Sequence, residues 1–185
     1  IANYSFMFGG TNDNINEILK INKKEVPAIK LFLGSSTGNM LVDNPNSLEN
    51  IFSKVDIPIA VHCEDETTIK DNLKLHIEAY GEKIPITCHN KIRSEEACYL
   101  SSSMAVSLAK KTGARLHVFH ISTAKELALF ENISLKEKNI TCEVCIHHLN
   151  FSEEDYIKFG SKIKWNPSIK TKNDQNELWK ALNTN

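Results

Sequence analysis

Three side chains that could take part in metal chemistry lie in or at the end of apolar segments. Lys30 lies inside the segment 28–33, and His62 and His120 each end a segment of the same kind. A buried ammonium group is costly unless it is paired or neutralised. Lys30 therefore either extends its amine to the rim of a sheet or is modified. The relevant modification is carbamylation, in which carbon dioxide adds to the neutral amine and gives a carboxylate-like group that can bridge two divalent metals.

The two histidines strengthen the interpretation as a metal site. A lone histidine in a sequence is more often structural than a ligand. His62 and His120, however, fall at the same point of two successive strands, and imidazole is the commonest ligand of zinc-like ions. The sequence therefore predicts that both histidines and Lys30 share a metal site.

The elements that must position these residues alternate between strands and helices, which predicts parallel βα units. In a barrel built from such units the active site lies at the carboxyl ends of the strands. A complete (β/α)8 barrel needs about 250 residues, so we expect an α/β fold with about five βα units of a TIM-type barrel, as one partial domain over residues 1–185. The alternative is an open doubly wound sheet, although no Gly-x-Gly-x-x-Gly or P-loop supports a nucleotide-binding version of it.

The strands are expected at 2–8, 27–33, 58–62, 115–120, 140–146 and 162–165, and the helices at 13–24, 47–55, 65–80, 94–112, 123–133 and 174–182.

Composition restricts the function classes. The net charge is −1, with 41% apolar and 24% charged residues, which gives no electrostatic reason to expect nucleic acid or an anionic membrane as a partner. No apolar run approaches the length of a membrane-spanning helix. The five cysteines are odd in number and irregular in spacing, which favours reduced thiols in a cytoplasmic protein over a disulfide framework.

Several segments together resemble the dihydroorotase branch of the amidohydrolase superfamily, in particular its bacterial type-I-like enzymes. They are KLFLGSSTGNMLVD at 30–43, VHCE at 61–64, IRSEEAC at 92–98, RLHVFHIST at 115–123 and EVCIHHL at 143–149. WNPSIK at 165–170 is similar to the family's Asn-Pro-Pro-Leu-Arg segment, with Ser168 and Lys170 as departures. Each segment alone is moderately specific, but their order and spacing cover nearly the whole chain.

The resemblance implies a role for particular residues. Lys30 matches the carbamylated lysine that bridges two divalent ions, zinc by default, and His62 and His120 match the histidines that hold the more exposed ion. Asn166 matches a residue that contacts the dihydroorotate ring, and the loop 34–44 matches a mobile loop that closes over the substrate. The implied reaction is the reversible hydrolysis of dihydroorotate to N-carbamoyl-L-aspartate in pyrimidine biosynthesis, by a metal-activated hydroxide. A small-molecule substrate and a homodimer are the partners that the family suggests.

Parts of the family's machinery do not occur in the sequence. The His-x-His pair of the first strand and the proton-transferring aspartate of the last strand are both missing. The chain also starts at Ile1 within an apolar segment, so we expect a piece of a longer protein that is inactive alone and binds at most one metal weakly. The alternatives are a hydantoinase, dihydropyrimidinase or allantoinase, a non-catalytic scaffold homologue, and a small independent βα binding module.

Other polar residues receive less weight. His147 and His148 follow a strand, and one of them either supports the metal shell or bonds to backbone. Glu143 is a candidate second-shell group or extra ligand. His117 is expected to point away from His120, because the two lie three residues apart on a strand. Arg93 is expected to pair with the glutamates at 95–96 at a helix start.

Overall fold

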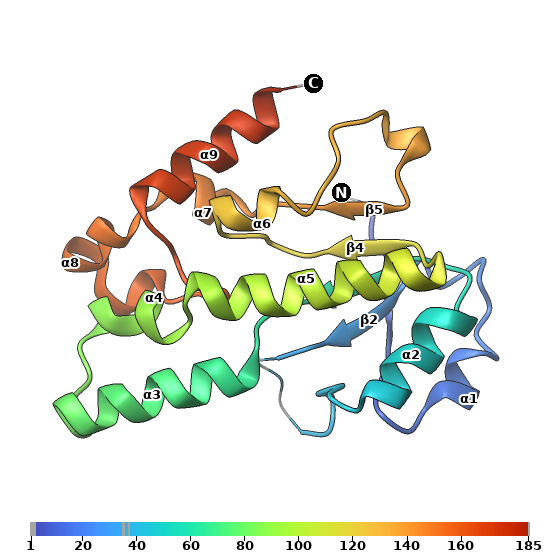
Figure 1. Ribbon diagram of the computed structural model, residues 1–185, viewed down its shortest axis with the longest axis horizontal. Coiled ribbons are helices and arrows are strands. Elements are labelled where there is room, and N and C mark those ends of the chain that lie inside the picture. Colours follow the sequence, from blue (N-terminus) through green and yellow to red (C-terminus); the bar gives the residue numbers. More distant parts are fainter. Residues whose placement is uncertain (1–2, 35, 37, 185) are drawn as a thin grey trace.

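The computed structural model describes residues 3–34, 36 and 38–184, and its centre is a parallel sheet in which every strand pairs with the next one along the chain (Figure 1). Such an order is the one expected from consecutive right-handed βα units. The predicted partial barrel with five βα units is confirmed. The strands are β1 (Phe8–Gly9), β2 (Ile29–Phe32), β3 (Ile59–His62), β4 (Leu116–Val118) and β5 (Ile140–Cys142).

The long helices begin and end at residues that satisfy their free backbone groups. The Asp65 side chain accepts a hydrogen bond from the backbone N–H of Thr68 and caps α3 (Glu66–Tyr80). Ser94 caps α5 (Glu95–Thr112) in the same way, and Gly113 ends that helix in the left-handed conformation. The other helices are α1 (Ile15–Ile18), α2 (Pro45–Lys54), α4 (His89–Ile92), α6 (Ala124–Leu127), α7 (Ile146–Asn150), α8 (Tyr156–Phe159) and α9 (Lys172–Asn183), with 3-10 turns at Ile86–Cys88, Leu135–Glu137, Glu153–Asp155 and Gly160–Ile163.

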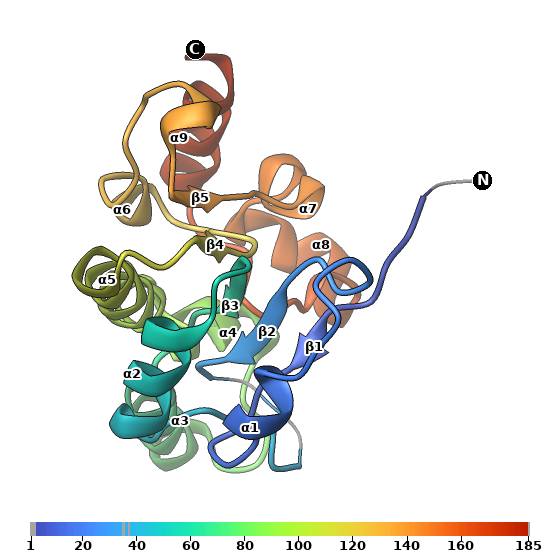
Figure 2. The same ribbon diagram turned by 90° about the vertical axis from the view of Figure 1, so that its right-hand side faces the viewer.

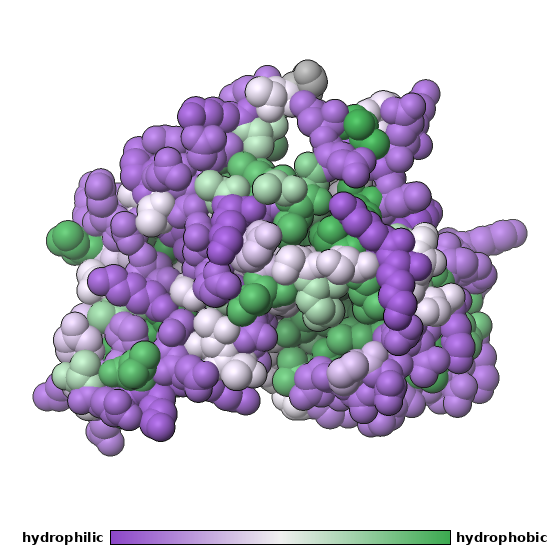
Figure 3. Space-filling model, viewed as in Figure 1, coloured by the Kyte–Doolittle hydropathy of each residue, from purple (hydrophilic) through white to green (hydrophobic). Residues whose placement is uncertain are grey.

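The main core lies between the sheet and the helices on its outer side. Alternate strand residues, such as Ile29 and Leu31, are fully buried there against Phe52 of α2 and Val106 of α5. Figure 2 shows α2, α5 and α6 along this side of the strands. The remaining strand residues point to the inner face, where the predicted metal ligands lie. Apolar side chains also reach the surface where α5 crosses the view in Figure 3, and Leu100 and Met104 of α5 are exposed.

Several elements differ from the predicted ones. The segment 3–7 forms no strand, and Tyr4 and Phe6 are exposed. The helix expected at 13–24 is reduced to α1. The N–H groups of Lys20 and Ile21 bond to carbonyls three residues back, and the Asn22 side chain then accepts from the backbone N–H of Lys24. The helix expected at 123–133 ends at Leu127.

The prediction of a strand at 162–165 is wrong. That segment continues from a 3-10 turn, Gly160–Ile163, and joins no sheet. Ile163 is buried against Tyr156 and Ile169 in a small second cluster. Its apolar side chain is therefore used for local packing, and the pattern of one apolar residue between lysines did not distinguish this from a strand.

Candidate metal centre

The inner face of the sheet brings strand residues into rows, because partners in register on parallel strands point to the same side. Lys30 is in register with Ala60 of β3, which is in register with His117 of β4. Phe32 and His62 form the next row toward the carboxyl ends. Lys30 and His62 therefore face the same side of the sheet, one row apart.

His120 reaches this face through an unusual backbone conformation. Its φ is +40°, in the left-handed region that side chains rarely adopt. The turn breaks the strand alternation after β4, so that His120 and His117 lie on the same face. The prediction that His117 points away from His120 is wrong: His117 is in the row of Lys30 on the inner face, and it bonds to Thr141 of β5 and to Glu143. A non-glycine residue held in this region stores backbone strain, which is often found at functional sites.

The two predicted metal ligands meet directly. Nδ1 of His62 lies 3.1 Å from Nε2 of His120, and Nε2 of His62 lies 2.9 Å from a carboxylate oxygen of Glu64. Glu64 accepts a hydrogen bond from Nε2–H of His62, and Nδ1 of His62 faces His120. Burial, with the neighbouring His62 and Lys30, lowers the pKa of His120 to about 3. His120 is thus a neutral imidazole, and a cation could share its Nε2 and the facing Nδ1 of His62.

Glu64 is the charged centre of the site and was not singled out from the sequence. It is fully buried, and one of its oxygens contacts both His62 and the guanidinium of Arg93. Burial acts to raise the pKa of Glu64, but the His62 hydrogen bond and the Arg93 charge outweigh it, and the pKa lies below its usual value. The expected pairing of Arg93 with the glutamates at 95–96 is wrong, because Arg93 turns inward to Glu64. The available signal was an acidic residue two positions after His62, at a strand end.

Lys30 lies in an apolar part of the same face. Its amine donates to the carbonyl of Leu31 and lies 4.0 Å from the ring centre of Phe32 and 5.1 Å from that of Phe119. Burial lowers the pKa of Lys30 to about 8, with a smaller opposing effect of Cys63. The side chain is therefore a neutral amine in a large fraction of molecules at mildly alkaline pH, which is the form that reacts with carbon dioxide.

The predicted lid loop, 34–44, is fixed at its end. Leu41 bridges to Phe32 of β2, and Asn12 donates to Asp43 and to the Leu41 carbonyl. Within the loop, Ser35 and Thr37 lie outside the described residues. Whether the loop closes over a substrate stays a prediction.

Gly34, at the start of this loop, has a packing role. A Cβ atom built on Gly34 would lie 1.9 Å from the backbone carbonyl oxygen of Glu64. We expect Gly34→Ala to force the ends of β2 and β3 apart and to lower the free energy of unfolding by about 2–3 kcal/mol. Gly113→Ala is the matched control, since its Cβ would meet open space in the left-handed conformation and should cost about 1 kcal/mol. Urea denaturation of both variants measures the difference, and equal losses would contradict the role of the close contact.

Asn166 is exposed on a segment that crosses the carboxyl edge of the sheet. His89 donates to the carbonyl of Trp165, and Nε2 of His148 bonds to the carbonyl of Pro167. Asn166 also lines a cavity together with Arg93, and Arg93 leads through Glu64 to His62. Arg93 therefore lies between the predicted substrate residue and the metal ligand His62.

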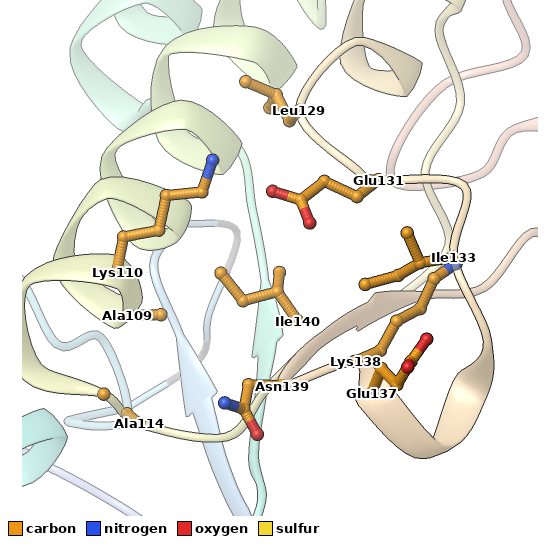
Figure 4. Close-up of a pocket in the computed structure, with 11 residues that line it drawn as sticks. Ala109, Lys110, Ala114, Leu129, Glu131, Ile133, Glu137, Lys138, Asn139 and Ile140 are labelled. Atoms are coloured by element: carbon orange, nitrogen blue, oxygen red, sulfur yellow. The ribbon is translucent and has the colours of Figure 1, made fainter.

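The polar residues that received less weight from the sequence have different surroundings. His148 is buried and bonds to backbone, one of its two expected roles, and His147 lies beside it in α7. Glu143 is half exposed and bonds to His117, so a second-shell or ligand role for it stays a prediction. A further cavity lies at the opposite end of the sheet, between α5 and the loop before β5, where Lys110 and Glu131 extend into it (Figure 4). It is remote from the histidines and has no part in the site.

Comparisons with known proteins agree with the motifs. No family model matches the chain. A dihydroorotase of Methanosphaera stadtmanae is 29% identical over 85% of this chain and 35% of its own length. A dihydroorotase of Deinococcus radiodurans is 41% identical over 67% of the chain and 29% of its own. An allantoinase of Rubrobacter xylanophilus is 27% identical over 70% and 28%. The chain thus spans about a third of the length of the curated relatives that it matches.

Solved structures show the same fold. An L-hydantoinase (dihydropyrimidinase) from Arthrobacter aurescens superposes with a TM-score of 0.87 at 24% identity, over 96% of this chain and 40% of the other. A dihydropyrimidinase from Brevibacillus agri superposes with a TM-score of 0.81 at 22% identity, over 96% and 40%. At these identities the likeness concerns the fold alone. The relatives and the fold agree that the chain is similar to about a third of a cyclic amidohydrolase.

Within that class, the sequence relatives are chiefly dihydroorotases. The resemblance to dihydroorotases that the motifs indicate is confirmed.

Proposed function

We propose that the protein of which this chain forms part is a dihydroorotase, which hydrolyses the cyclic amide of dihydroorotate to N-carbamoyl-L-aspartate in pyrimidine biosynthesis, and reverses the reaction. The observation that supports it best is the pair of facing nitrogens, Nδ1 of His62 and Nε2 of His120, above the row that holds Lys30. Two imidazoles that converge next to a buried lysine, whose pKa is lowered, supply half of the ligands of a binuclear metal site.

The residues present fit divalent ions, with zinc as the proposed metal. Nδ1 of His62 and Nε2 of His120 would hold one ion, and carbamylated Lys30 would bridge it to a second. Bound ions of this kind supply a nucleophile at neutral pH and polarise the carbonyl that is attacked. Imidazole and carboxylate donors are the set that zinc accepts in catalytic sites.

The chain's own residues have separate tasks in this proposal. Glu64 accepts the proton on Nε2 of His62, which fixes the tautomer and the ring orientation. Arg93 balances the buried charge of Glu64. Asn166 would contact the dihydroorotate ring, and the loop 34–44 would close over it and exclude water.

The proposal concerns a longer protein in which other segments complete the barrel. The curated relatives are about three times as long as the matched region. The His-x-His pair and the proton-transferring aspartate of the family would come from outside these 185 residues, and we propose that the chain alone is inactive. An intact mass above 20.9 kDa for the active protein is expected.

Substrate comparison tests the activity. The purified protein, supplied with zinc and bicarbonate, should hydrolyse dihydroorotate with a kcat/KM at least about 100-fold above that for hydantoin, dihydrouracil or allantoin. His120→Asn should abolish the activity, and His76→Asn is the matched control, because His76 bonds to the Asn72 carbonyl on α3, away from the site. Preference for another of these cyclic amides would replace the dihydroorotase assignment.

Two alternatives compete with this proposal. The allantoinase relative and the hydantoinase fold favour another cyclic amidohydrolase, and the same assay separates them. A non-catalytic scaffold would have lost its metal ligands, but Lys30, His62 and His120 are all present and converge on one face. No activity on any cyclic amide in a zinc-loaded protein would favour the scaffold.

We also propose a cellular location for the protein. All five cysteines are unpaired, which supports a reducing cytoplasmic environment. No helix among the described residues is long and apolar enough to cross a membrane. A homodimer and the absence of a nucleic-acid partner stay predictions.

A further inference from the structure

Three side chains around the start of α7 form a second cluster of potential metal ligands. One ligand atom each from Cys145, His147 and His148 lies within 4.8 Å of the other two. A tetrahedral zinc-like ion with bonds of about 2.0–2.3 Å would draw such atoms together by small side-chain rotations. These three residues are not used by the centre at Lys30, His62 and His120.

The buried member of the cluster is oriented as a ligand would be. His148 is 3% exposed, and its Nε2 lies 3.1 Å from the carbonyl oxygen of Pro167. A carbonyl accepts only from N–H, so the proton is on Nε2 and the lone pair is on Nδ1. That Nδ1 is buried and has no hydrogen-bond partner. A ligating histidine typically donates its other ring N–H to a carbonyl in this way, and a buried acceptor without a partner is otherwise costly.

The surroundings favour a cation. Burial, together with the charge of Glu143, raises the pKa of the Cys145 thiol. The same negative charge that opposes a bare thiolate attracts a divalent ion. On the other side, the ring of His147 stacks on Trp165, with ring centres 4.4 Å apart, which restricts the direction of His147. The cluster is half exposed at Cys145 and His147, so an ion can enter from solvent.

We propose that Cys145, His147 and His148 form a binding site for one borderline-soft divalent cation of the zinc type, separate from the centre at Lys30, His62 and His120. The thiol of Cys145 loses its proton to solvent as the sulfur–metal bond forms. Three protein ligands leave a fourth position for water or another small ligand. Because His147 contacts Trp165, a bound ion would also fix the segment next to Asn166.

Cobalt titration of the purified protein, after its metal has been removed, tests the site. Thiolate ligation of Co²⁺ gives a charge-transfer band in the near ultraviolet, which the nitrogen and oxygen donors proposed for the other centre do not give. The band should reach the intensity of one thiolate-bound Co²⁺ per chain and should remain in His62→Ala. Cys145→Ser should abolish it, and His148→Ala should weaken Co²⁺ binding by at least about 10-fold.

Cys142→Ala is the matched control, since this thiol lies three residues earlier, packed against the main core, and outside the cluster. A band that persists in Cys145→Ser, or that disappears equally in Cys142→Ala, overturns the proposal, as does the absence of any band. A second measurement needs no variant: Zn²⁺ in excess should protect Cys145, and not Cys142, from alkylation mapped by peptide mass. Equal alkylation of Cys145 with and without Zn²⁺ also overturns it.

Discussion

Lys30→Ala is expected to lower kcat/KM for dihydroorotate by on the order of 10³-fold in the purified protein, because several kcal/mol of transition-state stabilisation depend on the bridged metals. The variant should also bind less zinc. Lys23→Ala is the matched control: Lys23 is exposed, pairs with Asp56 at the surface, and should leave both quantities unchanged. Added acetate or propionate should restore part of the activity of Lys30→Ala, since a small carboxylate can occupy the place of the carbamate. Full activity in Lys30→Ala would exclude a bridging role.

The pH dependence of this modification has a definite direction. The pKa of Lys30 is lowered from 10.5 to about 8 by burial, and only the neutral amine reacts with carbon dioxide. In metal-free protein with bicarbonate, the carbamate on Lys30 should therefore form readily above about pH 8 and decline as the pH falls below it. Carbon-13 NMR with labelled bicarbonate measures this, and Lys30→Ala should show no such signal. An onset only near pH 10 would show that Lys30 is not desolvated.

The sequence was sufficient to predict β2 and β3, because each strand is one short apolar segment. The strands at 27–33 and 58–62 are apolar because one side packs against helices, and the polar exceptions Lys30 and His62 mark the other side. The position of His117 could not be predicted in this way. Strand alternation separates it from His120, but a single left-handed residue at His120 returns both to one face. Such a local backbone choice depends on tertiary contacts and leaves no periodic signal.

The partners of charged residues were equally difficult to predict. Arg93 lies two residues from a glutamate in sequence, yet its carboxylate partner is Glu64, which is 29 residues away in the chain. Long-range pairs of this kind depend on how α4 and α5 pack at the end of β3. The inward direction of Arg93 is decided by the cost of leaving Glu64 buried without a countercharge.

That cost makes Glu64 the position with the largest expected effect on stability. Glu64→Ala removes the carboxylate and leaves the Arg93 guanidinium, whose side chain is 15% exposed, without its partner. We expect the free energy of unfolding to fall by about 3–5 kcal/mol. Glu49→Ala removes an exposed carboxylate that pairs with Lys111 and should change stability by less than about 0.5 kcal/mol. Urea denaturation at neutral pH compares the two variants, and a loss for Glu64→Ala as small as for Glu49→Ala would contradict this account.

A second variant separates stability from metal positioning. Glu64→Gln keeps the size of the side chain, and its amide oxygen can accept from both Arg93 and Nε2 of His62 at the position of the shared carboxylate oxygen. The variant removes the negative charge, so the hydrogen bond that holds the His62 tautomer becomes weaker. We expect zinc affinity at this centre to fall by about 10–100-fold, with a smaller loss of stability than in Glu64→Ala. The pKa of Glu64 lies below its usual value, so the wild-type stabilisation is present at neutral pH and is lost as the pH falls through that lowered pKa. Unchanged zinc affinity in Glu64→Gln would show that the orientation of His62 does not depend on Glu64, and the buried carboxylate would then serve only to balance Arg93.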